Sequence, residues 1–165
     1  MTLHDLWPAL EQAPFAVAVR QNALLFPWIE SVHVLAISLV VGTVAIVDLR
    51  LLGVASRNKP VSRLAEEVLP YTWGAFLVAV TTGFLLFSSS ATGYAADIQF
   101  RLKLATMAVA GVNMLAFHFI PYRTVHQWDM APNTPVAAKV SAGLSLACWA
   151  AIIVFGRWVG FSLNS

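Results

Sequence analysis

The sequence predicts an all-α fold class, an integral membrane four-helix bundle with an N-terminal interfacial amphipathic segment. Of the 165 residues, 59% are hydrophobic, and the mean hydropathy is +0.74. Only 11% are charged, against about 25% in soluble domains. Most of these charges lie between four long uncharged stretches. A chain of this length holds one domain, so we expect residues 1–165 to form a single membrane domain.

The four uncharged stretches are each long enough to span a bilayer. They cover residues 31–47, most of 68–96, 104–122 and 140–156. A helix needs about 20 residues to cross about 30 Å of hydrocarbon, and flanking charged side chains can snorkel to extend a shorter run. We therefore expect spans at about residues 29–52, 70–90, 101–121 and 138–160, with a short amphipathic helix at 62–67 before the second. The runs do not alternate between polar and apolar residues, which favours helices over barrel strands.

The first 27 residues are predicted to lie at the membrane surface. They lack the basic start, apolar stretch and cleavage site of a signal peptide, and Pro8, Pro14 and Pro27 divide them into short pieces. Apolar residues recur at helical spacing opposite two acidic ones. The apolar set is Leu3, Leu6, Trp7 and Leu10, and the acidic pair is Asp5 and Glu11. This pattern is typical of an amphipathic segment that lies flat among the lipid headgroups.

The Lys and Arg residues near the span ends indicate the orientation. With four spans, the termini and the second loop share one side, which holds Arg20, Arg101, Lys103 and Arg157. The opposite side holds Arg50, Arg57, Lys59, Arg63, Arg123 and Lys139. Cytoplasmic loops are enriched in these residues, so six cations against four favour the cytoplasm for the second side. We expect a multi-pass protein of the bacterial inner (plasma) membrane with both termini in the periplasm.

Polar groups inside the apolar spans are the candidates for a functional site, because they are costly in hydrocarbon. His33 lies near the outer end of the first span, and His118 lies near the inner end of the third. The single cysteine, Cys148, excludes an internal disulfide and a Cys-rich metal site. The sequence contains no phosphate loop, nucleophile triad or metalloprotease motif. Its loop cations are not a nucleic-acid patch, so the lipid bilayer is the expected partner.

Helical wheels place both histidines on faces that carry other polar groups. At about 100° per residue, one face of the first span carries Glu30, His33, Ile37, Val44 and Asp48, and one face of the third carries Lys103, Met107, Met114 and His118. Small residues mark a face of the second span (Gly74, Val78, Thr81, Leu85, Ser88) and of the fourth (Ser141, Ser145, Cys148, Ile152, Gly156). Such faces permit close helix packing or leave space for a flat cofactor.

Depth decides which of these residues can meet. His33 opens the first span and Lys103 immediately precedes the third, which runs in the same direction, so the two lie at similar height. His118 is fifteen residues beyond Lys103, which places it about 20 Å deeper at about 1.5 Å per residue. His33 and His118 therefore cannot ligate one iron. They belong to two stacked sites, or only one of them binds a cofactor.

Several short motifs resemble those of known families. They are His33-Val34-Leu35-Ala36, Val41-Gly42, Asp48-Leu49-Arg50, Trp73-Gly74, Phe100-Arg101-Leu102-Lys103-Leu104, Asn113 and Gly156-Arg157-Trp158. Together they look like an uncharacterised bacterial family of four-helix inner-membrane proteins, a domain of unknown function. More distantly, His33 and the Arg101-Leu102-Lys103-Leu104 start of the third span are similar to copper-resistance-D-like membrane proteins and HemJ-type protoporphyrinogen oxidases. The latter resemblance implies b-type haem held by His33, with Lys103 as its partner in function.

A haem site also has a physical rationale in these residues. A neutral imidazole at His33 would ligate iron from the bundle interior, with His118 as the candidate ligand of a second site. Arg101, Arg157 or Lys103 could pair with the haem propionates, and Glu30, one turn before His33, could orient the site. We therefore expect a small inner-membrane haem-b-binding protein of electron transfer, with a quinone or a periplasmic cytochrome as partner. Enzymatic activity and a homo-oligomeric state stay open.

Structural interpretations of the same residues compete with haem binding. His33 could hydrogen-bond to a neighbouring helix, and His118 could bond to Tyr122 or Asn113 on its own helix. Asp48 and Arg50 are expected to form a structural ion pair with loop charges. In that case the protein would be a cofactor-free accessory subunit of a membrane complex or a small transporter.

Overall fold

The structure is a computed structural model that describes residues 3–56, 58–130 and 134–162. Four long helices dominate it: α3 (Leu25–Leu51), α4 (Val61–Ser89), α6 (Ile98–Phe119) and α8 (Val136–Ser162). Each belongs to a segment long and apolar enough to cross a membrane, and no strand occurs within the described ranges. The predicted fold class, an all-α membrane bundle of four spanning helices, is therefore confirmed. The chain is a multi-pass membrane protein.

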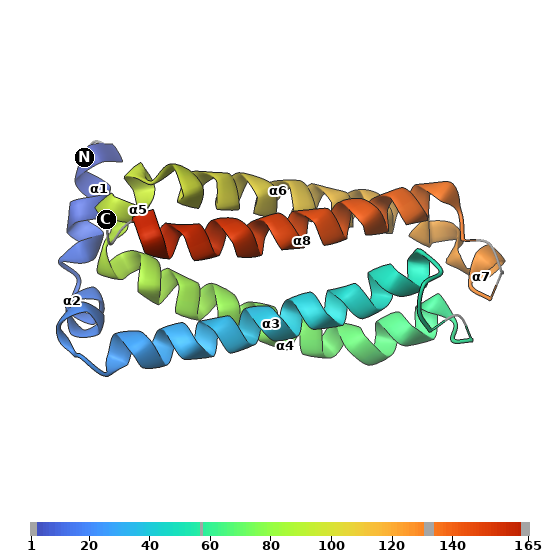
Figure 1. Ribbon diagram of the computed structural model, residues 1–165, viewed down its shortest axis with the longest axis horizontal. Helices are drawn as coiled ribbons and strands as arrows, with labels where there is room; N and C mark the ends of the chain where they lie inside the picture. The colour runs from blue at the N-terminus through green and yellow to red at the C-terminus, as the bar shows by residue number, and fades with distance from the viewer. Residues whose placement is uncertain (1–2, 57, 131–133, 163–165) are drawn as a thin grey trace.

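The four long helices form two antiparallel pairs. Helix α3 packs along α4, and α6 packs along α8, while α3 also contacts α8 and thereby joins the pairs (Figure 1). Short helices close the bundle at both ends. Helices α1 (Leu3–Glu11), α2 (Pro14–Gln21) and α5 (Ala91–Ala96) lie at the end that holds both termini, and η1 (Tyr122–Thr124) and α7 (Val125–Trp128) lie at the other.

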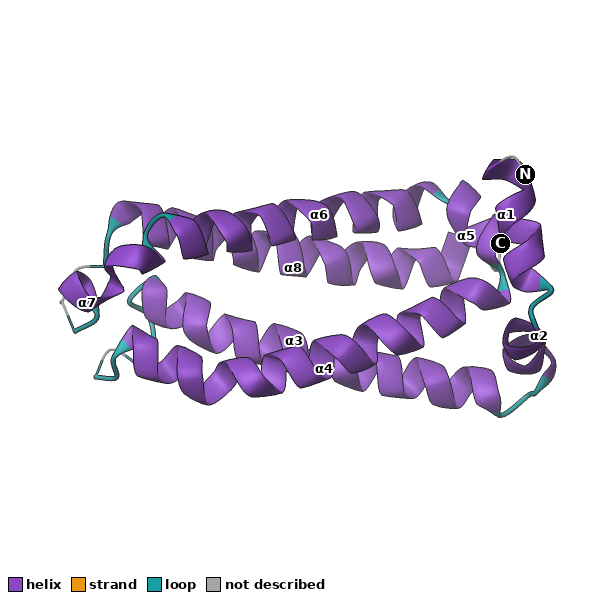
Figure 2. Cartoon of the chain, turned by 180° about the vertical axis from the view of Figure 1, so that it is seen from behind, coloured by secondary structure: helices purple, strands orange, loops and turns teal. Residues whose placement is uncertain are grey.

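The N-terminal segment forms two short helices that lie across one end of the bundle (Figure 2). Pro14 occupies the first turn of α2, where its missing N–H costs no hydrogen bond. Ala16 and Val19 of α2 are buried, and α2 packs on α4 and α3. Helix α1 contacts α5 and α4 instead. These contacts make the segment a cover over one end of the bundle.

Helix α4 is longer than its predicted span, because the segment 62–67 is its first part and not a separate helix. The helix also runs through Pro70 without a break in its assignment. Asp129, far away in sequence, stabilises its start. The Ser62 N–H donates to Asp129 Oδ1 at 2.9 Å, and the Ser62 hydroxyl donates to Oδ2. An acceptor at this place satisfies one of the unpaired N–H groups of the first turn.

The electrostatics of Asp129 follow from these bonds. Partial burial alone would raise the pKa of its carboxyl group. The hydrogen bonds from the Ser62 hydroxyl and from the Ser62 and Val61 N–H groups outweigh that effect together with the nearby His126, and the pKa lies below its usual value. The charged form is therefore the one that holds the first turn of α4.

The expected ion pair of Asp48 and Arg50 with loop charges is absent from the part of the chain that the structure describes. The buried Arg50 donates instead to two loop carbonyl oxygens, from Nε to Lys59 at 2.8 Å and from Nη2 to Asp129 at 3.2 Å. Asp48 faces α8, where its carboxyl group is hydrogen-bonded to Ser145. The prediction is wrong for these described residues, because loop carbonyl oxygens take up the Arg50 guanidinium and Asp48 turns toward α8, so neither side chain meets a loop charge.

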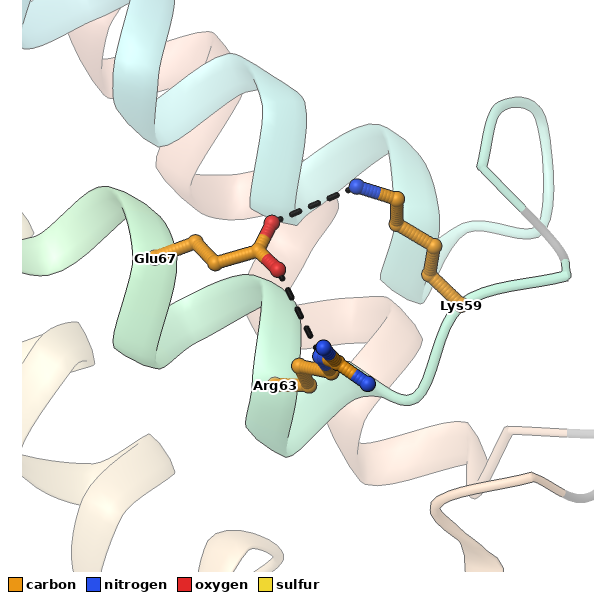
Figure 3. Close-up of polar contacts among 3 residues, drawn as sticks. All are labelled: Lys59, Arg63 and Glu67. Carbon is orange, nitrogen blue, oxygen red and sulfur yellow. Dashed lines mark hydrogen bonds and ion pairs between the residues drawn. The ribbon is translucent and has the colours of Figure 1, made fainter.

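The ion pairs that do occur among the described residues lie on the surface at this end. Figure 3 shows Glu67 between two cations, Lys59 at 3.2 Å and Arg63 at 3.5 Å. All three side chains are largely exposed, and such pairs contribute about 0.2–1 kcal/mol each. The buried cluster beside them stabilises this end more, because it removes apolar surface from solvent. It consists of Leu51, Val61, Val125, Trp128, Ala138 and Ala142.

The face of small residues that the helical wheel predicts points into the bundle on α8 but mostly away from it on α4. On α8, Cys148 and Ile152 are buried, and the other members of the predicted face are partly buried. On α4 most of the predicted face is outward, since Gly74, Val78 and Thr81 are exposed, whereas Leu85 is half-buried and Ser88 is buried. The face that packs inside carries Ala75, Ala79 and Gly83, one small residue every four positions. This spacing permits close approach of α3.

Candidate functional site

A cavity of about 400 Å³ lies inside the bundle, toward the end that α1 covers. All four long helices and α1 contribute to its wall, and its volume falls in the range of about 300–1,000 Å³ typical of cofactor sites. Its lining residues are Trp7, His33, Ile37, Val40, Phe76, Ala79, Val80, Gly83, Phe84, Phe87, Phe100, Lys103, Leu104, Met107, Trp149 and Ile152. Within this set His33 and Lys103 are the ionisable side chains. The structure thus brings together the two residues that the sequence predicts at one height.

His33 is held on α3 by a contact with α4. Its Nδ1 lies 2.9 Å from the Thr82 hydroxyl oxygen. The Thr82 hydroxyl has one proton, and it donates within its own helix to the Val78 carbonyl at 2.7 Å. We infer that His33 Nδ1 carries the ring proton and donates to Thr82, which leaves the lone pair on Nε2. A hydrogen bond that fixes one ring nitrogen in this way selects the tautomer in which the other can bind a metal.

Gly83 explains how the His33 ring fits against α4. A Cβ atom added at this glycine would lie 2.8 Å from His33 Cε1 and 3.5 Å from Nδ1. Real Cβ atoms do not approach a ring so closely, so a larger residue would displace the imidazole. Residue 83 therefore has to be a glycine if the ring is to keep both this position and its bond to Thr82.

Lys103 enters the cavity from the first turns of α6. Asp97 caps this helix by accepting a hydrogen bond from the Phe100 N–H at 2.7 Å. The cap fixes the start of α6 and therefore the position of the Lys103 backbone. The amine reaches Gly156 of α8, where an added Cβ atom would lie 3.6 Å from Nζ. Among the described residues Nζ has no hydrogen-bond or ion-pair partner, although its charge acts on His33. An amine in this setting favours an occupant with an anionic or electron-pair-donating group.

Aromatic rings close the cavity toward the end that holds both termini. Phe87 of α4 and Phe100 of α6 stack with centroids 5.3 Å apart, and Trp7 of α1 meets the Phe87 ring edge-on at 5.5 Å. Phe15 of α2 packs on Phe84 at 6.2 Å. Trp7, Phe84, Phe87 and Phe100 thus belong to the wall at that end, while His33 and Lys103 are half-buried. An apolar wall controls solvent access to a bound group and the local dielectric constant.

The other predicted site residues lie outside the cavity wall. Glu30 is exposed on α3. Arg101 is exposed and donates from Nε to the Ala95 carbonyl at 2.8 Å. Arg157 lies over the Phe161 ring, with Cζ 4.9 Å from the centroid. These three residues lie toward the same end of the bundle as the cavity but do not line it.

His118 lies near the opposite end of α6, exposed, with its ring stacked on Tyr122 at 5.0 Å. The structure therefore keeps it apart from His33, as depth predicts. Of its two expected partners, Tyr122 contacts it. Asn113 instead bonds to Ser141 of α8 through both its amide nitrogen and its oxygen at 3.0 Å. No cluster of three or more His, Cys, Asp or Glu that could hold a metal ion occurs among the residues that the structure describes.

Sequence reasoning missed several residues of the cavity. Thr82 and Gly83 lie off the α4 face that the wheel selected, and Trp7 was interpreted as a headgroup anchor. A usable pattern was present in α4, where Ala75, Ala79 and Gly83 recur every four residues. Trp149 and Phe100 had no local pattern, because their role follows from how the two helix pairs meet.

Residues 22–162, which include all four long helices with His33 and Lys103, match the model of a family of unknown function. The chain belongs to the DUF6644 family. The predicted resemblance to a family of unknown function is thereby confirmed. No curated protein and no solved structure matches the chain, and no similarity to the copper-resistance-D-like proteins or the HemJ-type oxidases was found. Helix α1, which brings Trp7 to the cavity, lies outside the DUF6644 match.

Proposed function

We propose that this protein is a small haem-b-binding protein that takes part in electron transfer in the bacterial inner membrane. The observation that carries the proposal is the state of His33. Its ring lines an apolar cavity between the spanning helices, and its Nδ1 lies 2.9 Å from the Thr82 hydroxyl oxygen. With the ring proton on Nδ1, as inferred above, Nε2 keeps its lone pair. A neutral imidazole whose other ring nitrogen is held by a hydrogen bond is a suitable axial ligand for b-type haem.

The cavity fits such a group in its chemistry. Its wall is apolar apart from His33 and Lys103, and the glycines at 83 and 156 let these two side chains lie close against α4 and α8. Haem b supplies one-electron redox chemistry when it is bound. In this chain His33 would hold the iron. The unpartnered amine of Lys103 would pair with a propionate carboxylate or act as a second ligand, and Arg101 and Arg157 lie at the same end to meet propionates at the surface.

The excess of Lys and Arg in the loops at the α7 end supports a location of the cavity in the periplasmic half of the membrane. If the loops at the α7 end are cytoplasmic, then the cavity and both termini face the periplasmic half of the membrane. An electron carrier at that depth would exchange electrons with a membrane quinone or with a periplasmic cytochrome. This assignment of partners rests on the orientation, and the orientation is tested separately below.

Pigment in the purified protein tests the proposal. The full chain, purified in mild detergent, is expected to show a sharp Soret band and a positive pyridine haemochrome reaction. His33→Ala should abolish both. His126→Ala and His118→Ala are the matched controls, because His126 follows Pro121 in the α7 region and His118 is exposed far from the cavity, and both should keep full haem content.

Two results would contradict this function. The first is a colourless protein that is nonetheless folded, as judged by its helical circular dichroism and its elution as a single species. The second is full haem occupancy in folded His33→Ala. The first result would favour a cofactor-free accessory subunit or a small transporter, and the second would remove His33 as the ligand.

A further inference from the structure

Asp48 is a buried acid that the cavity does not use. It lies on α3 near the end of the bundle away from the cavity, and the residue is 6% exposed. The Ser145 side chain of α8 is hydrogen-bonded to its carboxyl group. The other oxygen, Oδ2, has no hydrogen-bond partner among the described residues. The carboxyl group is thus inside the bundle and only half satisfied.

A positive charge that could compensate this carboxylate is missing from the described surroundings. Arg50 is engaged by the carbonyl oxygens of Lys59 and Asp129, and the described ion pairs belong to Glu67 (Figure 3). The helices that pack on α3 carry further ionisable groups. These are Arg20 on α2, Arg63, Glu66, Glu67 and Tyr71 on α4, and Lys139, Cys148 and Arg157 on α8. None of them forms an ion pair with Asp48.

The energetic comparison decides the state of this group. An ionised carboxylate without a compensating charge is far more costly inside a protein than an unpaired neutral polar atom. The protonated form of Asp48 is therefore more stable at this position than the ionised form. An intramembrane acid of this kind is a functional candidate by default, because apolar residues would fill the same space at no such cost.

We propose that Asp48 is a proton-binding site inside the bundle, a carboxylic acid that carries an exchangeable proton near the end of the bundle that holds α7. Ser145 donates to the carbonyl oxygen of this acid, and Oδ2 carries the proton. The site is independent of haem, so its failure and the failure of the haem proposal are separate results.

Dicyclohexylcarbodiimide is a probe for such a group, because it reacts with protonated carboxyl groups in apolar surroundings. The acid transfers its proton to one carbodiimide nitrogen, and the carboxylate oxygen adds to the central carbon to give an O-acylisourea. This adduct rearranges to a stable N-acylurea where water is excluded. No atom is lost and no oxidant is needed, so the protein gains the mass of one whole carbodiimide molecule.

The experiment treats the purified full chain in lipid vesicles with this reagent and maps the adduct by peptide mass spectrometry. We expect one adduct at Asp48 in the wild type and its loss in Asp48→Asn, whose amide oxygen can still accept from Ser145. The control is Asp97→Asn. Asp97 is a surface acid that caps α6, and this variant should keep the Asp48 adduct. Replacing potassium by sodium at constant pH should leave labelling unchanged, and protection by sodium would overturn the proposal in favour of an alkali-cation site.

Infrared spectroscopy decides the case where the reagent fails to enter. A protonated carboxyl group gives a C=O stretching band that shifts in D₂O, and this band should be present in the wild type and absent from Asp48→Asn. If the infrared band is present but no adduct forms, Asp48 carries a proton and the carbodiimide does not reach it, which supports the proposal. If the wild type shows neither the adduct nor the band, Asp48 is ionised and the proposal is wrong.

Discussion

Two glycines determine how the polar side chains of the cavity can lie. Gly83 faces the His33 ring, and Gly156 faces the Lys103 amine, but the clearances differ. An added Cβ atom would meet His33 Cε1 at 2.8 Å and Lys103 Nζ at 3.6 Å. The first distance is a clash and the second is an ordinary contact. At the residue scale, His33 is therefore the more constrained of the two groups, as expected for a ligand whose ring orientation matters.

Gly83→Ala should displace the His33 ring and break its bond to Thr82. The matched control is Gly74→Ala in the same helix, where an added Cβ atom meets nothing within 4 Å. Both variants gain the same helix propensity, up to about 1 kcal/mol. The difference in stability between them should therefore isolate the clash, about 1–3 kcal/mol. Thermal unfolding in detergent measures it, and equal stability of the two variants would show that the ring moves freely.

Lys103 allows a test of its role through two substitutions. If its amine ligates iron or pairs closely with haem, the planar guanidinium of Lys103→Arg cannot replace it, and the Soret band should shift or the haem content should fall. Lys103→Met, which can ligate iron without a charge, belongs beside it. Membrane insertion should stay intact in both. Unchanged spectra in both variants would exclude ligation and leave Lys103 as a snorkelling cation at the membrane interface.

The sequence predicts the positions of His33 and Lys103 because depth along a helix is fixed by residue number alone. It does not predict Thr82 or Trp7. Which residue of α4 meets His33 depends on the rotation of one helix against another, and a wheel that misjudges this rotation selects Thr81 instead of Thr82. Trp7 depends on how α1 lies across the bundle, which local amphipathicity leaves undetermined.

At the element scale, the start of α4 depends on a carboxylate from another segment. Asp129 accepts from the N–H and the hydroxyl group of Ser62, so it acts as a helix cap that is distant in sequence. This contact joins the first turn of α4 to the segment before α8. It also explains why the helix begins as early as Val61 and includes the part that the sequence suggests as a separate short helix.

Asp129→Ala should destabilise the protein by about 1 kcal/mol near neutral pH, the usual cost of losing a helix cap. Because the folded pKa of Asp129 lies below the unfolded value, its contribution is fully present above about pH 4 and is lost as the pH falls through the folded value. The difference between variant and wild type should therefore shrink in acid. The control is Glu66→Ala, which removes an exposed acid from α4, the helix that Asp129 caps. A difference that does not depend on pH would contradict this account.

The wheels succeed for α8 and fail for α4 for a physical reason. In α8 the small and polar residues face inward because that helix contacts both α6 and α3. In α4 the hydroxyl groups of Thr81 and Thr82 donate to carbonyl oxygens of their own helix, so a threonine can face lipid without an unsatisfied donor. Polarity alone is therefore a poor guide to the inner face of a membrane helix.

At the scale of the whole molecule, the two ends of the bundle differ. One end holds the termini, α1, α2 and α5, and the cavity lies toward it (Figure 1). The other end holds the loop carbonyls that engage Arg50, the Asp129 cap, the Glu67 ion pairs and the buried cluster around Trp128. At the end that holds the termini, aromatic rings surround the cavity. At the α7 end, hydrogen bonds and buried apolar side chains hold the helices together. The orientation of these ends in the membrane decides which compartment each of them meets.

Reporter fusions test that orientation directly. The end that holds α7 contains six of the ten Lys and Arg residues, and cytoplasmic loops carry the excess of such residues. Fusions after Lys59, and after Asn133, which lies outside the described residues, should therefore behave as cytoplasmic. A fusion after Gly93, which lies in α5 at the opposite end, should behave as periplasmic. Alkaline phosphatase and a fluorescent protein, active on opposite sides, give complementary readouts at each position. The reverse pattern would place the cavity and both termini on the cytoplasmic side, and a periplasmic cytochrome could then no longer be the electron partner.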